Sequence, residues 1–287
     1  MSVLKRVYAT PSRVRGLYRY LLSCKNQTAS MESLEKVLSP VPLRSDENPK
    51  SFIKALVRES QRIGLVLERD GFVMLNPALD DEARDPKTGD ELLSFTISKQ
   101  IFSKDNAENN DLAKVMAWYL SQDVYEAPGT WTEAETALEE QIGGTKLGLN
   151  DARWGQFEDW GCYLGFAWCH SCNKVKKLTP DPTRYLKYCL KEIFQHAGEK
   201  ILPIKVLFDK LSEQCPVIEG GRFRNEIHQL RGIKNDDTLS SVTSFALSRL
   251  DKAGFIRMTQ TSDAELMVLT GVSTTRCSEI TWIGKGE

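Results

Sequence analysis

Basic residues recur every four positions in the segment 49–63, and this pattern constrains the local fold more than any other in the chain. When residues are placed at about 100° per step, one arc of about 120° holds Lys50, Lys54, Arg58 and Arg62. The opposite side holds the apolar residues Phe52, Ile53, Leu56, Val57 and Ile63. The pattern predicts a helix over 49–63 that buries one face and exposes four cations. Such a face is typical of contact with a polyanion, most often nucleic acid.

The elements predicted around this helix are two further helices and a hairpin. Apolar residues at helical spacing predict helices over 11–23 and 30–38. Asp70-Gly71 separates two short apolar stretches and predicts a hairpin turn, because both residues tolerate a positive φ. Three helices and a hairpin are the parts of a winged helix. In that fold the third helix can enter the major groove and the hairpin can touch the DNA backbone.

Further arginines extend the predicted interface beyond this helix. Arg69 lies beside the turn and could reach a phosphate, and no acidic residue precedes Glu32 in the basic N-terminal segment. The residues predicted to bind DNA are Lys50, Lys54, Arg58, Arg62, Arg69, Arg13 and Arg19. The alternative is a solvated or protein-binding face, because lysine and arginine also favour helices.

The same order of elements is predicted near the C-terminus. Helices are expected over 183–196, 203–214 and 239–253, followed by a hairpin that pairs 255–260 with 265–270. The last of these helices is rich in serine and threonine, and its only basic residues are Arg249 and Lys252. A second winged helix of this character suits a protein partner as well as it suits DNA.

The middle of the chain is predicted to be helical, after a polar linker over 77–90. Helices are expected over 91–103, 111–121, 131–141 and 152–169. The last carries an aromatic stripe that includes Trp154, Phe157 and Trp168, which we interpret as core; the alternative is an exposed stacking platform for bases. The predicted fold is therefore mainly α with small β-hairpins (α+β). Its domains are a winged helix (1–78), a helical acidic domain (91–178) and a winged-helix-like domain (179–287).

Charge is divided unevenly along the chain, although the net charge is only −1. Residues 1–75 carry a charge of +6, residues 76–160 carry −11, and residues 161–287 carry +4. This asymmetry favours duplex DNA as a partner at one or both ends. The absence of a long apolar stretch predicts no membrane span and no secretory signal. Seven scattered cysteines indicate reduced thiols and a cytoplasmic location.

One motif suggests a metal site. Cys169 and Cys172 have the spacing of a zinc-binding pair, but a structural zinc site needs four ligands. No second pair exists, although Cys189 and His196 could complete the set in principle. The alternative is two partly buried thiols at the end of a helix. We therefore predict no metal and no cofactor.

No catalytic motif is evident either. None of the three histidines lies in a nucleophile motif, and Gly143-Gly144-Thr145-Lys146 lacks the spacing of a phosphate-binding loop. The segment after Gly220-Gly221 suggests a secondary anion patch formed by Arg222, Arg224 and Arg231. The chain is predicted not to be an enzyme.

Three segments resemble the DpdG family, which is encoded with bacterial systems that insert 7-deazaguanine bases into DNA and restrict unmodified DNA. They are Ala9-Thr10-Pro11-Ser12-Arg13-Val14, Thr179-Pro180-Asp181-Pro182-Thr183-Arg184 and Pro216-Val217-Ile218-Glu219-Gly220-Gly221-Arg222-Phe223-Arg224. The resemblance implies a non-enzymatic component of an antiviral defence arm, working beside a co-encoded helicase or nuclease. It carries no catalytic motif, so it assigns no functional residues.

Two functions from different classes follow, with a third behind them. The first is a DNA-binding adaptor that recruits partner enzymes in a restriction system. The second is a tandem winged-helix subunit that binds proteins, like those that clasp kleisins in chromosome-organising complexes, and has no DNA affinity of its own. The third is an enzyme whose active site is dispersed along the sequence.

Overall fold

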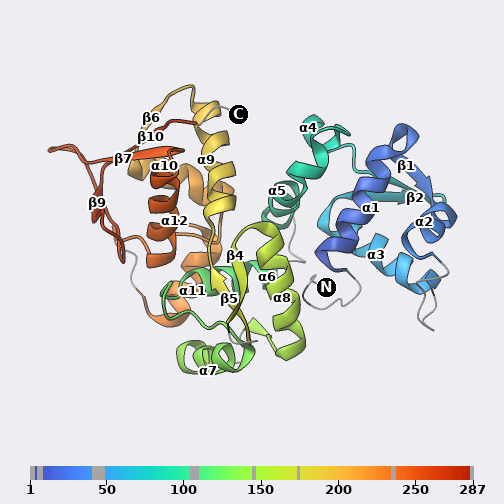
Figure 1. Cartoon of the computed structure of the whole chain (residues 1–287), viewed down its shortest axis with the longest axis horizontal. Helices are drawn as coiled ribbons and strands as arrows, with labels where there is room; N and C mark the ends of the chain where they lie inside the picture. The colour runs from blue at the N-terminus through green and yellow to red at the C-terminus, as the bar shows by residue number, and fades with distance from the viewer. Residues whose placement is uncertain are drawn as a thin grey trace. The chain divides into compact units, whose positions relative to one another are not determined.

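The computed structural model describes residues 4, 9–40, 49–103, 110–143, 147–172, 175–233 and 237–284. These residues are mainly helical with small antiparallel sheets, which confirms the predicted α+β class. The chain forms two compact units, Met1–Asn110 and Asp111–Glu287. Figure 1 draws the first in blue to teal and the second in green to red. The predicted domain boundaries at residues 78 and 178 both fall inside these units.

The first unit contains three helices, a three-stranded antiparallel sheet and two more helices, with a short 3-10 turn after the first helix. In chain order they are α1 (Pro11–Ser23), η2 (Lys25–Gln27), β1 (Thr28–Ser30), α2 (Met31–Leu38), α3 (Pro49–Ile63), β2 (Val66–Arg69), β3 (Phe72–Leu75), α4 (Asp81–Arg84) and α5 (Gly89–Phe102). The strand order is β1-β3-β2. Strands β2 and β3 form the predicted hairpin, in which Asp70 and Gly71 have φ of 51° and 78°.

The predicted linker is wrong, because its residues fold against α1. The buried Tyr18 hydroxyl donates to the Ala83 carbonyl oxygen at 2.6 Å. Arg15 donates two hydrogen bonds to the carboxylate of Asp90, at 2.7 and 2.8 Å. Leu79 and Ala83 are buried as well. Residues 79–90 are therefore part of the first unit, and Figure 1 shows α4 and α5 within it.

The second unit is built from helices and three small antiparallel sheets. Its elements are α6 (Asn110–Leu120), α7 (Trp131–Ile142), α8 (Asp151–Leu164), β4 (Ala167–Cys172), β5 (Val175–Pro180), α9 (Thr183–Ala197), β6 (Ile201–Pro203), α10 (Ile204–Gln214), α11 (Arg222–Arg231), α12 (Ser241–Lys252), β7 (Ile256–Thr259), β8 (Met267–Val268), β9 (Arg276–Cys277) and β10 (Glu279–Trp282). The sheets are β6-β10-β7, β4-β5 and β8-β9. The core includes Trp118, Tyr119, Phe157, Trp160 and Tyr185.

Two predictions for this unit are wrong. The predicted helix 152–169 ends at Leu164, because Gly165 adopts a left-handed conformation (φ 86°) and the chain continues as β4. Trp168 consequently leaves the helical face that buries Trp154 and Phe157. The predicted C-terminal hairpin is also wrong, because β7 pairs with β10, whereas 267–268 pairs with 276–277. Thr261, just after β7, hydrogen-bonds to Ser278, just before β10, so the residues between them form a loop that is closed at its base.

The other predicted helices agree with the structure to within a residue or two at each end. No helix among the described residues is long and apolar enough to cross a membrane.

Candidate nucleic-acid interface and a polar pocket

Helix α3 separates its charges from its apolar residues as the sequence predicts. Ile53, Leu56 and Val57 are buried, whereas Lys54 and Arg58 are exposed. Pro49 and Lys50 begin the helix, but their side chains lie outside the described part of the structure. Because Lys54 and Arg58 are one helical turn apart, their side chains project from the same face. Two cations of the predicted basic face are thus open to solvent together.

Arg62 differs from the two cations before it. Its side chain is only 19% exposed, and its Nη1 lies 3.3 Å from Oε2 of Glu59 on the preceding turn. Glu59 is almost completely buried, so the positive charge of Arg62 compensates a carboxylate inside the protein. Its contribution to the basic face is therefore smaller than the sequence spacing predicts.

The structure places Arg13 beside α3 and Arg69 at the hairpin turn. The guanidinium of Arg13, an exposed residue on α1, lies 4.8 Å from the ring centroid of Phe52, a geometry that favours attraction between a cation and an aromatic face. Arg69 is exposed at the end of β2, next to Asp70 and Gly71. Both arginines are thus accessible in the same unit as α3.

Arg19 lies next to an acidic residue. Its Nε is 3.5 Å from Asp90, the carboxylate that already accepts two hydrogen bonds from Arg15. Those hydrogen bonds hold the pKa of Asp90 below its usual range. No pattern in the sequence indicates that Arg15 and Arg19 share a partner, because Asp90 lies in the segment predicted as a linker. Part of the N-terminal positive charge is therefore compensated within the first unit.

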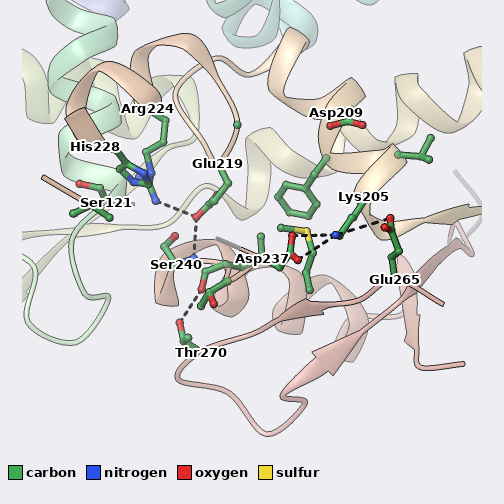
Figure 2. A pocket seen from close by; sticks show the side chains of 17 residues that line it. Ser121, Lys205, Asp209, Glu219, Arg224, His228, Asp237, Ser240, Glu265 and Thr270 are labelled. Atoms are coloured by element: carbon green, nitrogen blue, oxygen red, sulfur yellow. Dashed lines mark hydrogen bonds and ion pairs between the residues drawn. The ribbon is translucent and has the colours of Figure 1, made fainter. Parts of the chain in front are cut away.

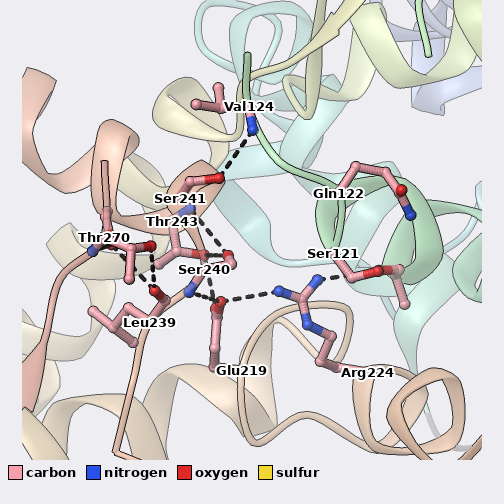
Figure 3. A network of polar contacts seen from close by, with 12 residues as sticks. Ser121, Gln122, Val124, Glu219, Arg224, Leu239, Ser240, Ser241, Thr243 and Thr270 are labelled. Carbon is pink, nitrogen blue, oxygen red and sulfur yellow. Dashed lines mark hydrogen bonds and ion pairs between the residues drawn. The ribbon is translucent and has the colours of Figure 1, made fainter. Parts of the chain in front are cut away.

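Helix α12, the predicted counterpart of α3, is turned into its own unit. Ser241, Thr243, Ser244 and Ser248 are buried, and their neighbours are protein groups. Ser241 Oγ accepts from the Val124 amide at 2.9 Å, and Ser244 Oγ accepts from the Thr270 amide at 3.0 Å. Figure 3 shows the contact between Ser241 and Val124. The polar positions of α12 are thus unavailable to a DNA groove.

A buried ion pair lies beside α12. Arg224 is 1% exposed, and its Nη2 donates to Oε1 of Glu219 at 3.0 Å while Nη1 donates to the Ala117 carbonyl at 3.1 Å. Glu219 also accepts from the Ser240 amide (2.9 Å) and the Thr243 hydroxyl (2.7 Å). Burial by itself would raise the pKa of Glu219, but Arg224 and these hydrogen bonds lower it overall. Glu219 is therefore ionised within the network shown in Figure 3.

This network overturns the predicted anion patch on α11. Arg224 is enclosed, and Arg231 donates to the Ser121 hydroxyl at 2.7 Å and to its carbonyl at 3.2 Å. The guanidinium of Arg222 lies 4.6 Å from the ring centroid of Phe223. The sequence spacing of these arginines carried no information about which of them would face inward.

A cavity of about 620 Å³ opens next to the ion pair. Arg224 and Glu219 form part of its wall, together with apolar residues that include Phe208, Leu239 and Met267. Lys205 lies at the other end, 3.1 Å from Asp237 and 3.9 Å from Glu265 (Figure 2). The Nε of Arg224 has no hydrogen-bond partner among the described residues. Sequence reasoning did not find this pocket, because its lining comes from distant segments.

A family model described as DpdG-like matches residues 1–264. The chain belongs to the DpdG-like family. This confirms the resemblance seen in the sequence and links this DpdG-like chain to 7-deazaguanine DNA modification systems. No curated protein and no solved structure matches it.

The Cys169-His170-Ser171-Cys172 motif of this DpdG-like protein lies on a strand and not at the end of a helix. The side chain of Cys172 lies outside the described part of the structure. Cys169 lies against Cys162 of α8, and burial, followed by this neighbour, raises the pKa of Cys162 to about 12. Among the described residues, no group of three metal-ligating side chains gathers.

Proposed function

We propose that this DpdG-like protein is a non-enzymatic, cytoplasmic DNA-binding adaptor of a bacterial defence system linked to DNA modification. It contacts duplex DNA through its first unit and recruits partner enzymes, such as a co-encoded helicase or nuclease. The observation that carries the proposal is the joint exposure of Lys54 and Arg58 on α3, opposite the buried Ile53, Leu56 and Val57.

The topology of the first unit supports a winged helix as the DNA-binding element. Its elements run helix, strand, helix, helix, strand, strand, and its sheet has the order β1-β3-β2. In a winged helix of this order, α3 is the helix that enters the major groove. The β2–β3 hairpin then serves as the wing, and Arg69 at its turn contacts a phosphate. Arg13, packed on Phe52 at the start of α3, contacts a second part of the backbone.

The charges of the proposed interface suit contact with phosphates more than sequence readout. Lys54 and Arg58 are long cationic side chains, and phosphate contacts from such residues supply most of the sequence-independent affinity for DNA. Arg62 pairs with Glu59, so it adds little net charge to the surface that α3 presents to DNA.

The test of this proposal is a gel shift with the full-length protein and a duplex, using a Lys54→Glu/Arg58→Glu variant. Both side chains are exposed, so we expect the variant to fold and to lose duplex binding at a salt concentration where the wild type binds. The matched control is Lys252→Glu, which reverses an exposed charge on α12 and should bind as the wild type does. Equal binding by wild type and the double variant would refute the proposed interface.

A second candidate function is a protein-interaction subunit of the kleisin-associated type, without DNA affinity of its own. The pocket of Figure 2 favours it, because a largely apolar wall suits an apolar segment of a partner protein, and the two carboxylates Asp237 and Glu265 outnumber the one Lys205 that they face. It predicts a stable complex with a co-encoded protein and no duplex binding at low salt. A metal-dependent nuclease assay on the purified protein tests the remaining possibility of an enzyme.

A further inference from the structure

Trp168 is an exposed tryptophan in a unit whose other tryptophans are buried or half-buried. Its side chain is 60% exposed, whereas Trp118, Trp154 and Trp160 are almost fully buried. An indole ring left in water costs hydrophobic free energy, and exposed aromatic residues of this size are typical of binding surfaces. Trp168 therefore presents a flat aromatic face to solvent.

The β4–β5 hairpin holds Trp168 in a fixed orientation. In its register Trp168 lies opposite Thr179 and His170 lies opposite Lys177, so these four side chains share one face of the hairpin. The rings of Trp168 and His170 are stacked, with centroids 5.0 Å apart and planes inclined by 26°. His170 Nε2 lies 3.3 Å from Thr179 Oγ1, which fixes the imidazole in turn. The indole is thus supported on one side before any ligand arrives.

Cations gather at a pocket that Trp168 helps to line. The pocket has a volume of about 360 Å³, and its charged lining among the described residues consists of Arg184, Lys187, Arg249 and Asp181. Each cation is held in place. Arg184 donates to the Tyr163 carbonyl, Arg249 pairs with Asp181, and Lys187 Nζ lies 3.8 Å from the ring centroid of Phe255. One carboxylate faces three cations, so the pocket carries a net positive charge.

We propose that this pocket binds an unpaired nucleotide of DNA. The base stacks on Trp168, and Arg184 and Lys187 bind its phosphate. A flat aromatic ring beside fixed cations is the arrangement by which proteins bind single strands without reading their sequence. In an intact duplex both faces of a base are covered by its neighbours, so the site takes a nucleotide that is outside the stack. Lys177 contributes less charge, because it pairs with Glu133 at 3.3 Å.

The test is the fluorescence anisotropy of a labelled oligo(dT) 12-mer, titrated with the full-length protein at low salt. Loss of one stacked base costs about 1–3 kcal/mol, so Trp168→Ala should weaken binding about tenfold, and Trp168→Phe should retain most of it. The matched control is Tyr125→Ala, which removes another exposed ring of the same unit that does not line the pocket. It should bind as the wild type does, and circular dichroism checks that each variant folds.

Two charge-reversal variants complete the test. Lys187→Glu should weaken oligo(dT) binding, whereas Lys200→Glu, an exposed position outside the pocket, should leave it unchanged. Polyglutamate should compete far less well than unlabelled oligo(dT). Failure of the wild type to bind oligo(dT), unchanged binding by Trp168→Ala, or equal competition by polyglutamate would each overturn the proposal. The site is independent of α3, since Trp168→Ala should keep duplex binding, and Lys54→Glu/Arg58→Glu should keep oligo(dT) binding.

Discussion

Arg224 and Glu219 form an ion pair that is enclosed by protein, and its contribution to stability depends on both partners being present. Removing the carboxylate leaves a guanidinium buried without compensation, which typically costs about 3–5 kcal/mol. We therefore expect Glu219→Ala to destabilise the second unit by about this amount, measured by urea unfolding. Replacing both residues together, as Glu219→Leu/Arg224→Met, should restore much of the loss. A cost for Glu219→Ala well below 1 kcal/mol would show that water reaches the pair.

The same carboxylate gives a prediction about pH. The pKa of Glu219 in the folded protein lies below its ordinary value of 4.5, so its ionised form stabilises the fold at pH values above 4.5. As the pH falls below that value, the unfolded chain takes up a proton first and the stabilisation is lost. The stability difference between the wild type and Glu219→Gln should therefore be constant near neutral pH and shrink as the pH falls below 4.5. Urea midpoints at these pH values measure it, and a constant difference would contradict the assignment.

Individual residues were predictable from the sequence where periodicity decides their direction. Lys54 and Arg58 are exposed because Ile53, Leu56 and Val57 must be buried on the same helix. Arg62 follows the same spacing but turns toward Glu59, a carboxylate whose burial no periodicity indicates. Arg224 also turns inward where periodicity does not indicate it, since its partners are Glu219, just before α11, and the distant Ala117 carbonyl of α6.

At the scale of the element, the hairpin turn of the first unit depends on its glycine. Gly71 has a φ of 78°, a left-handed conformation that costs other residues about 1–2 kcal/mol. We expect Gly71→Ala to lower the stability of the first unit by about 1 kcal/mol, measured by urea unfolding, although no atom would clash with the added methyl group. The control is Gly155→Ala within α8, where the added methyl group also meets open space. It should stabilise the protein, because alanine favours a helix over glycine. Equal effects of both changes would contradict the role of φ at Gly71.

Elements were predictable where the signal is local. Helices with clear apolar spacing and the Asp70-Gly71 turn are set by neighbouring residues, and the structure confirms them. The end of α8 was missed because aromatic residues continue at helical spacing beyond Gly165, whose positive φ ends the helix. The partner of β7 was missed because β10 lies about twenty residues further along the chain, beyond a shorter stretch that also looked like a strand.

At the scale of the whole molecule, a net charge of −1 conceals the region proposed to bind DNA. Each phosphate neutralised on a duplex contributes about −0.9 to the slope of log K against log salt concentration. If Lys54 and Arg58 each contact one phosphate, Lys54→Glu/Arg58→Glu should reduce the magnitude of that slope by about 2. Titrations of labelled duplex at several salt concentrations measure it. An unchanged slope would place the contacting charges elsewhere in the protein.

The division of the molecule was the part of the fold least accessible from sequence. Residues 79–90 are polar and contain proline and glycine, as linkers do, and the sequence therefore predicted a boundary there. What joins them to α1 is a small number of specific contacts, such as the one from Tyr18 to the Ala83 carbonyl. Contacts of this kind between distant residues leave no pattern in composition or periodicity.

Those contacts determine where the chain can be truncated to obtain a folded first unit. A piece that stops at residue 78 would lack Leu79, Ala83 and Leu93, which are buried in the intact unit, and it would strip α1 of its cover near Tyr18 and Leu22. The apolar surface exposed to solvent by the truncation would make such a fragment prone to aggregate, and its failure to bind DNA would say nothing about α3. A fragment that extends to the end of α5 keeps that surface buried.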